Sequence, residues 1–135
     1  MEQLTLTGTR IQLVLRDVLA DGSTFTNVCM QQLHFNDANL SGTKITNANL
    51  SDLEIDGAQL GGAYIHNIGM PPKDHQRFDA KAKQRSLRFE DCDLNNSSIS
   101  NCNLSGVEIK NCNLDGMRIN GIPVNDLLAK YHSHQ

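Results

Sequence analysis

The clearest pattern along the chain is a large apolar residue at every fifth position. In the first half of the chain these residues are Phe35, Leu40, Ile45, Leu50, Ile55 and Leu60. A period of five matches neither the 3.6-residue period of a helix nor the unbroken alternation of a long strand. The residue two positions earlier is small or apolar, as Ala38 is before Leu40. This spacing predicts a short extended leg in each unit, and the polar residues between legs predict a corner.

The same pattern returns in a second block after residue 86. Its large apolar residues are Phe89, Leu94, Ile99, Leu104, Ile109, Leu114, Ile119 and Val124. A fainter form extends back from the first block through Val28 and Ser23 towards Val18. Corner positions often hold glycine or asparagine, as at Gly42 and Asn47, and both types accept the positive φ angle of tight turns. The repeat therefore predicts legs and corners over residues 18–70 and 87–124.

Individual units of this repeat read ANLSG, ANLSD, AQLGG, CDLNN, CNLSG and CNLDG. On these units the chain resembles the pentapeptide repeat family, over about residues 18 to 124. The resemblance implies an all-β fold, a right-handed parallel quadrilateral β-helix with four units to a coil and about five coils. We expect one domain over 1–135, with an N-terminal strand or cap in 1–17 and a short C-terminal capping helix in 125–135.

In such a coil, residues one turn apart are expected to stack about 4.8 Å apart, like neighbouring strands. One inward column then contains Ala38, Ala58, Cys92 and Cys112. We therefore expect buried, reduced thiols at all four cysteines, Cys29, Cys92, Cys102 and Cys112. On the outward side, the same register predicts an ion-pair ladder in which Arg88 lies between Glu54 and Glu108.

Both ends of a β-helix need covering, because open ends expose strand edges and core side chains. The N-terminal stretch alternates Ile11, Leu13 and Leu15, which predicts a strand that begins the wall or covers its first coil. The C-terminal stretch predicts a helix that starts at Asn125 or Asp126. Its apolar residues, which we expect to cap the coil, are Leu127, Leu128 and Tyr131. The alternative is a homodimer in which two such helices meet.

Residues 71–86 interrupt the repeat and begin with two prolines. The stretch 70–88 holds six basic and two acidic residues, whereas the remaining chain holds six basic and thirteen acidic residues. One interpretation is a projecting arm that binds an acidic partner. The candidate residues of that arm are Lys73, Arg77, Phe78, Lys81, Lys83 and Arg85. The other interpretation is a solvated excursion attracted to the acidic coil, and an exposed Phe78 would favour the first.

The motifs of enzymes are missing from the sequence, which has no glycine-rich phosphate loop, HExxH pair, CxxC pair or GxSxG elbow. We therefore expect no enzyme, no catalytic residue, no cofactor and no metal site. No run approaches the roughly 20 apolar residues of a membrane span, and the first residues lack the pattern of a signal peptide. We expect a cytoplasmic protein that does not associate with membranes.

The function predicted from these features is a non-enzymatic scaffold that binds an unknown protein partner. The resemblance supplies an alternative, because some relatives imitate the shape and charge of duplex DNA and engage type II topoisomerases such as gyrase. The modestly acidic coil and basic loop fit that role poorly, while a projecting loop fits it well. We do not expect direct nucleic-acid binding, since the cations of the loop are not interleaved with aromatic residues.

Overall fold

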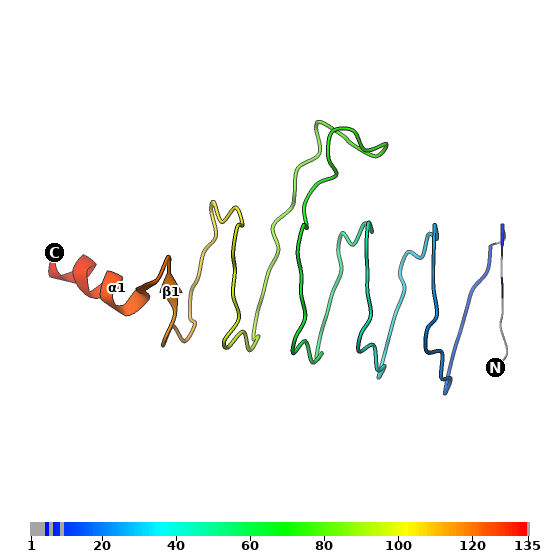
Figure 1. Cartoon of the computed structure of the whole chain (residues 1–135), viewed down its shortest axis with the longest axis horizontal. Coiled ribbons are helices and arrows are strands. Elements are labelled where there is room, and N and C mark those ends of the chain that lie inside the picture. Colours follow the sequence, from blue (N-terminus) through cyan, green and yellow to red (C-terminus); the bar gives the residue numbers. More distant parts are fainter. Residues whose placement is uncertain (1–4, 6, 9, 135) are drawn as a thin grey trace. The chain divides into compact units, whose positions relative to one another are not determined.

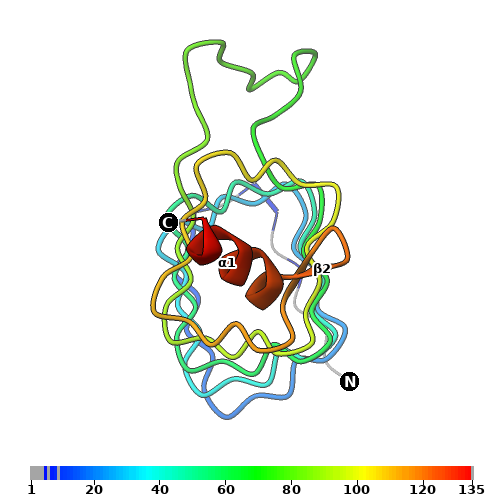
Figure 2. The same ribbon diagram turned by 90° about the vertical axis from the view of Figure 1, so that its left-hand side faces the viewer.

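The computed structural model describes residues 5, 7–8 and 10–134. Contacts divide the chain into two compact units, Met1–Gly61 and Gly62–Gln135. Within each unit, short extended legs joined by corners carry the chain through successive circuits (Figure 1, Figure 2). The helix and strands of the described residues lie near the end of the second unit. They are β1 (Arg118–Ile119), β2 (Ile122–Pro123) and α1 (Val124–Ser133).

The backbone takes a positive φ at every fifth residue. In the first block these residues are Asp17, Gly22, Asn27, Gln32, Asp37, Gly42, Asn47, Asp52, Gly57, Gly62 and Asn67. In the second block they are Asp91, Asn96, Asn101, Gly106, Asn111 and Gly116. Nearly all are glycine, asparagine or aspartate, the residue types that adopt this conformation at least cost. The predicted alternation of leg and corner is confirmed, and it extends back to residue 17.

The corners are of two alternating kinds. Where the large apolar residue of a unit is leucine, a hydrogen bond closes a β-turn directly after it. For example, the Thr43 N–H donates to the Leu40 carbonyl at 3.1 Å. The residue before the leucine adds a second bond, in which Asn39 Oδ1 accepts the Ser41 N–H at 3.1 Å. The same side-chain bond recurs at Asn49, Asp93, Asn103 and Asn113. Where the large apolar residue is isoleucine, the described chain has neither the backbone turn bond nor the side-chain bond. The positive-φ residue turns the backbone there without them.

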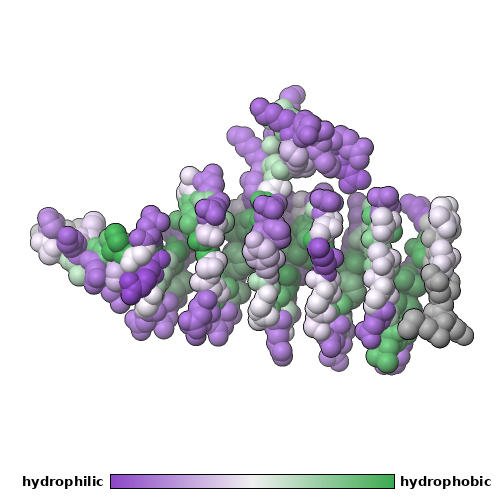
Figure 3. Space-filling model, viewed as in Figure 1, coloured by the Kyte–Doolittle hydropathy of each residue, from purple (hydrophilic) through white to green (hydrophobic). Residues whose placement is uncertain are grey.

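The predicted hydrophobic core does not form within either unit. Among the described residues only Val124 is a buried hydrophobic residue, at 7% exposure, whereas Leu50 is 46% exposed. The prediction of buried thiols is wrong, because Cys29, Cys92, Cys102 and Cys112 are exposed and free. The physical reason is that the turn hydrogen bonds of the described residues join positions close in sequence, and none of these turn bonds joins legs a whole circuit apart. Figure 3 shows the hydrophobic residues on the inner side of the legs, with hydrophilic residues at the corners.

The outward ion pairs run along single legs. Arg88 pairs with Glu90 at 3.1 Å, and Lys110 pairs with Glu108 at 3.0 Å. Alternate residues of an extended leg point to the same side roughly 7 Å apart, so long side chains reach each other there. Within the second unit Arg88 pairs with Glu90 and Glu108 pairs with Lys110, so the predicted pairing of Arg88 with Glu108 is wrong, whereas its pairing with Glu54 stays a prediction. Pairs this exposed contribute only about 0–1 kcal/mol to stability.

The N-terminal stretch does not form the predicted strand where the structure describes it. Ile11, Leu13 and Leu15 are exposed, and none is part of a strand. The other residues of the predicted cap include 1–4, 6 and 9, which lie outside the described residues.

A β-hairpin follows the last leg of the second block. β1 and β2 pair antiparallel, with Ile119 opposite Ile122. Between them, Asn120 and Gly121 have φ angles of 48° and 81°. Two consecutive positive φ angles are typical of a type I′ turn, which the Asn-Gly pair favours because neither residue resists that conformation strongly. The hairpin thus delivers the chain directly to the start of α1.

The helix α1 begins at Val124, directly after Pro123, so the predicted start at Asn125 or Asp126 is wrong. The Val124 N–H donates to the Met117 carbonyl at 3.0 Å, and a backbone group thus replaces the expected side-chain cap. Asp126 lies in the first turn of α1 and Lys130 in the last, which complements the helix dipole. In Figure 2, α1 crosses the end of the coil from which it emerges.

The corner geometry makes a direct prediction about two adjacent glycines. Gly62 has a φ of +78°, and an added Cβ would meet no atom within 4 Å, so Gly62→Ala carries only the conformational cost of about 1–2 kcal/mol. Gly61 has equally open space and does not have a positive φ, so Gly61→Ala should be neutral or stabilise by up to about 1 kcal/mol. Urea unfolding followed by circular dichroism measures both. Equal effects of the two substitutions would contradict the corner requirement.

Candidate interaction surface

The loop of residues 71–86 is a series of tight turns. The His75 N–H donates to the Pro72 carbonyl at 2.9 Å, and the Phe78 N–H donates to the His75 carbonyl at 2.9 Å. A third turn closes at 3.2 Å between the Ala82 N–H and the Asp79 carbonyl. In the second unit, this loop projects away from the legs on either side of it (Figure 1, Figure 2). The loop therefore has local order of its own.

Side chains reinforce two of these turns. His75 Nδ1 accepts the Arg77 N–H at 3.1 Å, and Asp79 Oδ1 accepts the Lys81 N–H at 2.9 Å. Sequence reasoning missed His75 and Asp79 as organising residues of the loop. For Asp79 a signal was present, because aspartate at the start of a turn commonly accepts the N–H two residues on.

The predicted basic residues all lie on this loop, and most have no acidic partner. Lys73, Arg77, Lys81 and Lys83 form no ion pair within the part of the chain that the structure describes. Each of these side chains is exposed, as is Arg85. The positive charges of Lys73, Arg77, Lys81 and Lys83 are therefore not neutralised by an ion pair within the described residues.

Phe78 is exposed at 38%, although it is an aromatic residue among charged neighbours. Its exposure is at the low end among the large apolar residues of the described chain, where Leu50 is 46% exposed, and a binding arm stays a prediction. An aromatic side chain beside an arginine is a common composition of energetically important positions in protein interfaces.

The helix α1 carries the second set of predicted contact residues. Val124 is buried, whereas Leu127, Leu128 and Tyr131 are exposed at 39%, 44% and 62%. The Tyr131 ring meets the His132 ring edge to face at 5.5 Å, a contact within the helix itself. The apolar residues of α1 therefore remain accessible in a single chain.

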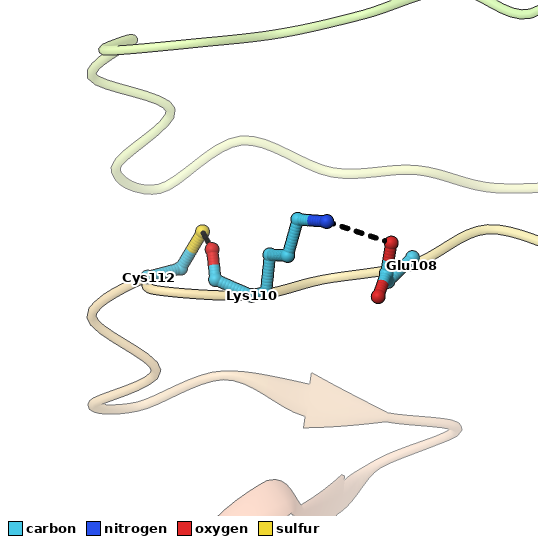
Figure 4. A network of polar contacts seen from close by, with 3 residues as sticks. All are labelled: Glu108, Lys110 and Cys112. Carbon is cyan, nitrogen blue, oxygen red and sulfur yellow. Dashed lines mark hydrogen bonds and ion pairs between the residues drawn. The ribbon is translucent and has the colours of Figure 1, made fainter.

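The cysteines of the second block support corners. The Cys112 Sγ–H donates to the Lys110 carbonyl at 3.2 Å, beside the ion pair of Lys110 with Glu108 (Figure 4). Cys92 and Cys102 make the same contact with the carbonyls of Glu90 and Ser100. These thiols directly follow the corners that lack a turn hydrogen bond, so they satisfy a carbonyl there. A thiol donor is weak, and this contact is a minor one.

Two aromatic rings stack on one leg of the repeat. Tyr64 and His66 stack with ring centroids 4.2 Å apart, and His66 Nδ1 lies 3.1 Å from Asn67 Nδ2. No group of three or more His, Cys, Asp or Glu side chains among the described residues is arranged to hold a metal ion. Within the same residues, no helix has both the length and the apolar character to cross a membrane.

Comparison with protein families identifies the repeat. A family model described as pentapeptide repeats matches residues 34–67 and 88–122, in eight copies. The chain belongs to the pentapeptide repeat family. Its repeats therefore build a β-helix, a solenoid fold, and the loop falls in the gap between the two matched stretches. Neither a comparison with curated proteins nor one with solved structures finds a match.

The pentapeptide repeat protein should tolerate loss of the loop. We consider a loop-replaced variant in which residues 72–84 give way to a short Gly-Ser turn. The turn hydrogen bonds of residues 72–82 close within the loop, and shortening a surface loop changes closure entropy by only about 1 kcal/mol or less. We expect an unfolding free energy within about 1 kcal/mol of the intact chain, measured in urea. A loss of several times that amount would show that the loop supports the fold.

Proposed function

We propose that this pentapeptide repeat protein is a non-enzymatic scaffold that binds another protein through residues 71–86. The observation that carries the proposal is a loop of ordered turns with an exposed Phe78, in which Lys73, Arg77, Lys81 and Lys83 form no ion pair within the described residues. Preformed turns favour binding because less conformational freedom is lost when the partner docks. The proposed contact residues are Lys73, Arg77, Phe78, Lys81, Lys83 and Arg85.

We propose that the scaffold that carries this loop is one right-handed quadrilateral β-helix of about five coils. It would form a single domain over 1–135. The alternation of the two corner kinds supports this proposal, because it gives the chain a ten-residue period. With four units to a coil, each corner then stacks on a corner of its own kind. In this proposal α1 caps the C-terminal end of the coil, consistent with its buried Val124.

Two further features of the proposal concern partners and location. The exposed Leu127, Leu128 and Tyr131 support pairing of α1 with α1 of a second copy as the alternative to a cap. The proposed location is the cytoplasm, which is consistent with four free cysteines. The projecting loop also supports an alternative function, a DNA-mimic modulator of gyrase. A supercoiling assay distinguishes this alternative from the scaffold.

The test is an affinity capture from lysate with the intact chain and the loop-replaced variant, alongside a second, differently tagged copy of the chain. We expect at least one protein to be captured by the intact chain and lost from the loop-replaced variant. Lys81→Glu should weaken capture several-fold, since it reverses a charge at the proposed contact. The matched control is Lys44→Glu, the same charge reversal on an exposed coil residue, which should leave capture unchanged.

Identical capture by the two chains would contradict the role of the loop. Recovery of the second tagged copy alone, independent of the loop, would favour the homodimer through α1. Inhibition or protection of gyrase by the intact chain at micromolar concentration, in a supercoiling assay, would favour the DNA-mimic alternative.

A further inference from the structure

His75 connects two turns of the loop through three hydrogen bonds. Its N–H donates to the Pro72 carbonyl, its carbonyl accepts the Phe78 N–H, and its Nδ1 accepts the Arg77 N–H at 3.1 Å. The residue thus fixes the backbone on both sides of itself. Arg77 and Phe78, which carry the charge and the apolar surface of the proposed contact, are the residues that it orients.

The bond at Nδ1 is a histidine version of a contact used elsewhere in the chain. Asparagine or aspartate accepts the N–H two residues on at Asn39, at Asp93 and, in the loop itself, at Asp79. At residue 75 an imidazole nitrogen takes this place. A backbone N–H can only donate, so Nδ1 must offer its lone pair, and the contact requires an imidazole without a proton at Nδ1.

The surroundings of His75 are charged and lie within the same loop. Lys73, Asp74, Arg77, Asp79 and Lys81 are the charged residues within six positions of it, and all are exposed. The side chain of His75 makes its one hydrogen bond, in the part of the chain that the structure describes, to Arg77 of this loop. Two backbone bonds, from the His75 N–H to the Pro72 carbonyl and from the Phe78 N–H to the His75 carbonyl, close the double turn beside this side-chain bond.

We propose that the double turn centred on His75 is the recognition element for an acidic protein segment with an apolar side chain, and that the neutral imidazole of His75 stabilises it. This inference rests on the proposed function of the loop. Arg77 would pair with a carboxylate of the segment, and Phe78 would contact its apolar residue.

The charge distribution favours a short protein segment over a long polyanion. The chain outside 70–88 has thirteen acidic and six basic residues, so it repels a duplex or an anionic membrane that approaches the whole protein. A short segment needs to reach only the loop. Phe78 is also the one aromatic residue of the loop, whereas stacking surfaces for nucleic acid use several.

Two opposing effects accompany protonation of His75. A proton at Nδ1 removes the acceptor of the Arg77 N–H and weakens the turn, while the new positive charge attracts an acidic segment. We expect the weakening of the turn to dominate, because the loop already carries five basic residues and gains little from one more charge.

The experiment measures binding of a fluorescent acidic peptide, Asp-Glu-Phe-Glu-Asp, to the full chain by anisotropy at pH 7.5 and 5.5. The intact chain should bind about three- to tenfold more tightly at pH 7.5, the ratio expected from one hydrogen bond. His75→Asn keeps an acceptor that does not titrate, so it should bind equally at both pH values. His75→Ala should bind weakly at both, and Phe78→Ala should weaken binding without changing the pH ratio.

Several results would overturn this inference. One is the same pH dependence in His75→Asn as in the intact chain. Others are equal binding by His75→Ala and the intact chain at pH 7.5, or tighter binding of a single-stranded DNA oligonucleotide or phosphatidylserine vesicles than of the peptide. If these occur while the loop-replaced variant still loses a captured protein, the inference fails and the proposed function stands. If capture is also unchanged by loop replacement, both fail.

Discussion

Every fifth residue of the repeat must take a positive φ, and the other features of the chain follow from this constraint. Most residue types resist that conformation by about 1–2 kcal/mol each, so a long series of such corners is affordable only with glycine, asparagine and aspartate. These types hold all but one of the positions between 17 and 67 and every position between 91 and 116. Gln32, with a φ of 59°, is the exception and carries more of this cost.

The two kinds of corner use different hydrogen bonds. A corner after leucine closes a turn with the backbone and adds an asparagine or aspartate side chain, as at Asn103 with the Ser105 N–H. A corner after isoleucine relies on its left-handed residue and, in the second block, on a thiol such as Cys102 two residues before the next leucine. The loop uses the same side-chain device, with His75 in place of asparagine. One local contact thus serves both the repeats and the proposed binding element.

Corner positions and the presence of the loop could be predicted from the sequence, because each depends on residue types that have strong local preferences. Gly42 and Asn47 mark corners directly, and paired prolines with a change of charge mark the loop. The start of α1 could not be predicted, since the Met117 carbonyl that replaces a side-chain cap comes from another segment. Burial of the cysteines was predicted from the stacking of coils, a long-range contact that the turn bonds do not determine. The role of His75 was missed because histidine has no turn preference comparable to that of asparagine.

We propose that alternating corners wind the chain so that residues twenty apart stack and residues ten apart lie on opposite walls. The test uses pyrene labels on cysteines introduced at outward positions. The native cysteines are first replaced by alanine, the residue that the first block has at the equivalent positions 38, 48 and 58. Labels at Glu90→Cys and Lys110→Cys should give strong excimer fluorescence, because stacked strands lie about 4.8 Å apart. Labels at Ser100→Cys and Lys110→Cys should give almost none, although they are closer in sequence. The reverse result, or equal excimer emission from both pairs, would show that residues twenty apart do not stack.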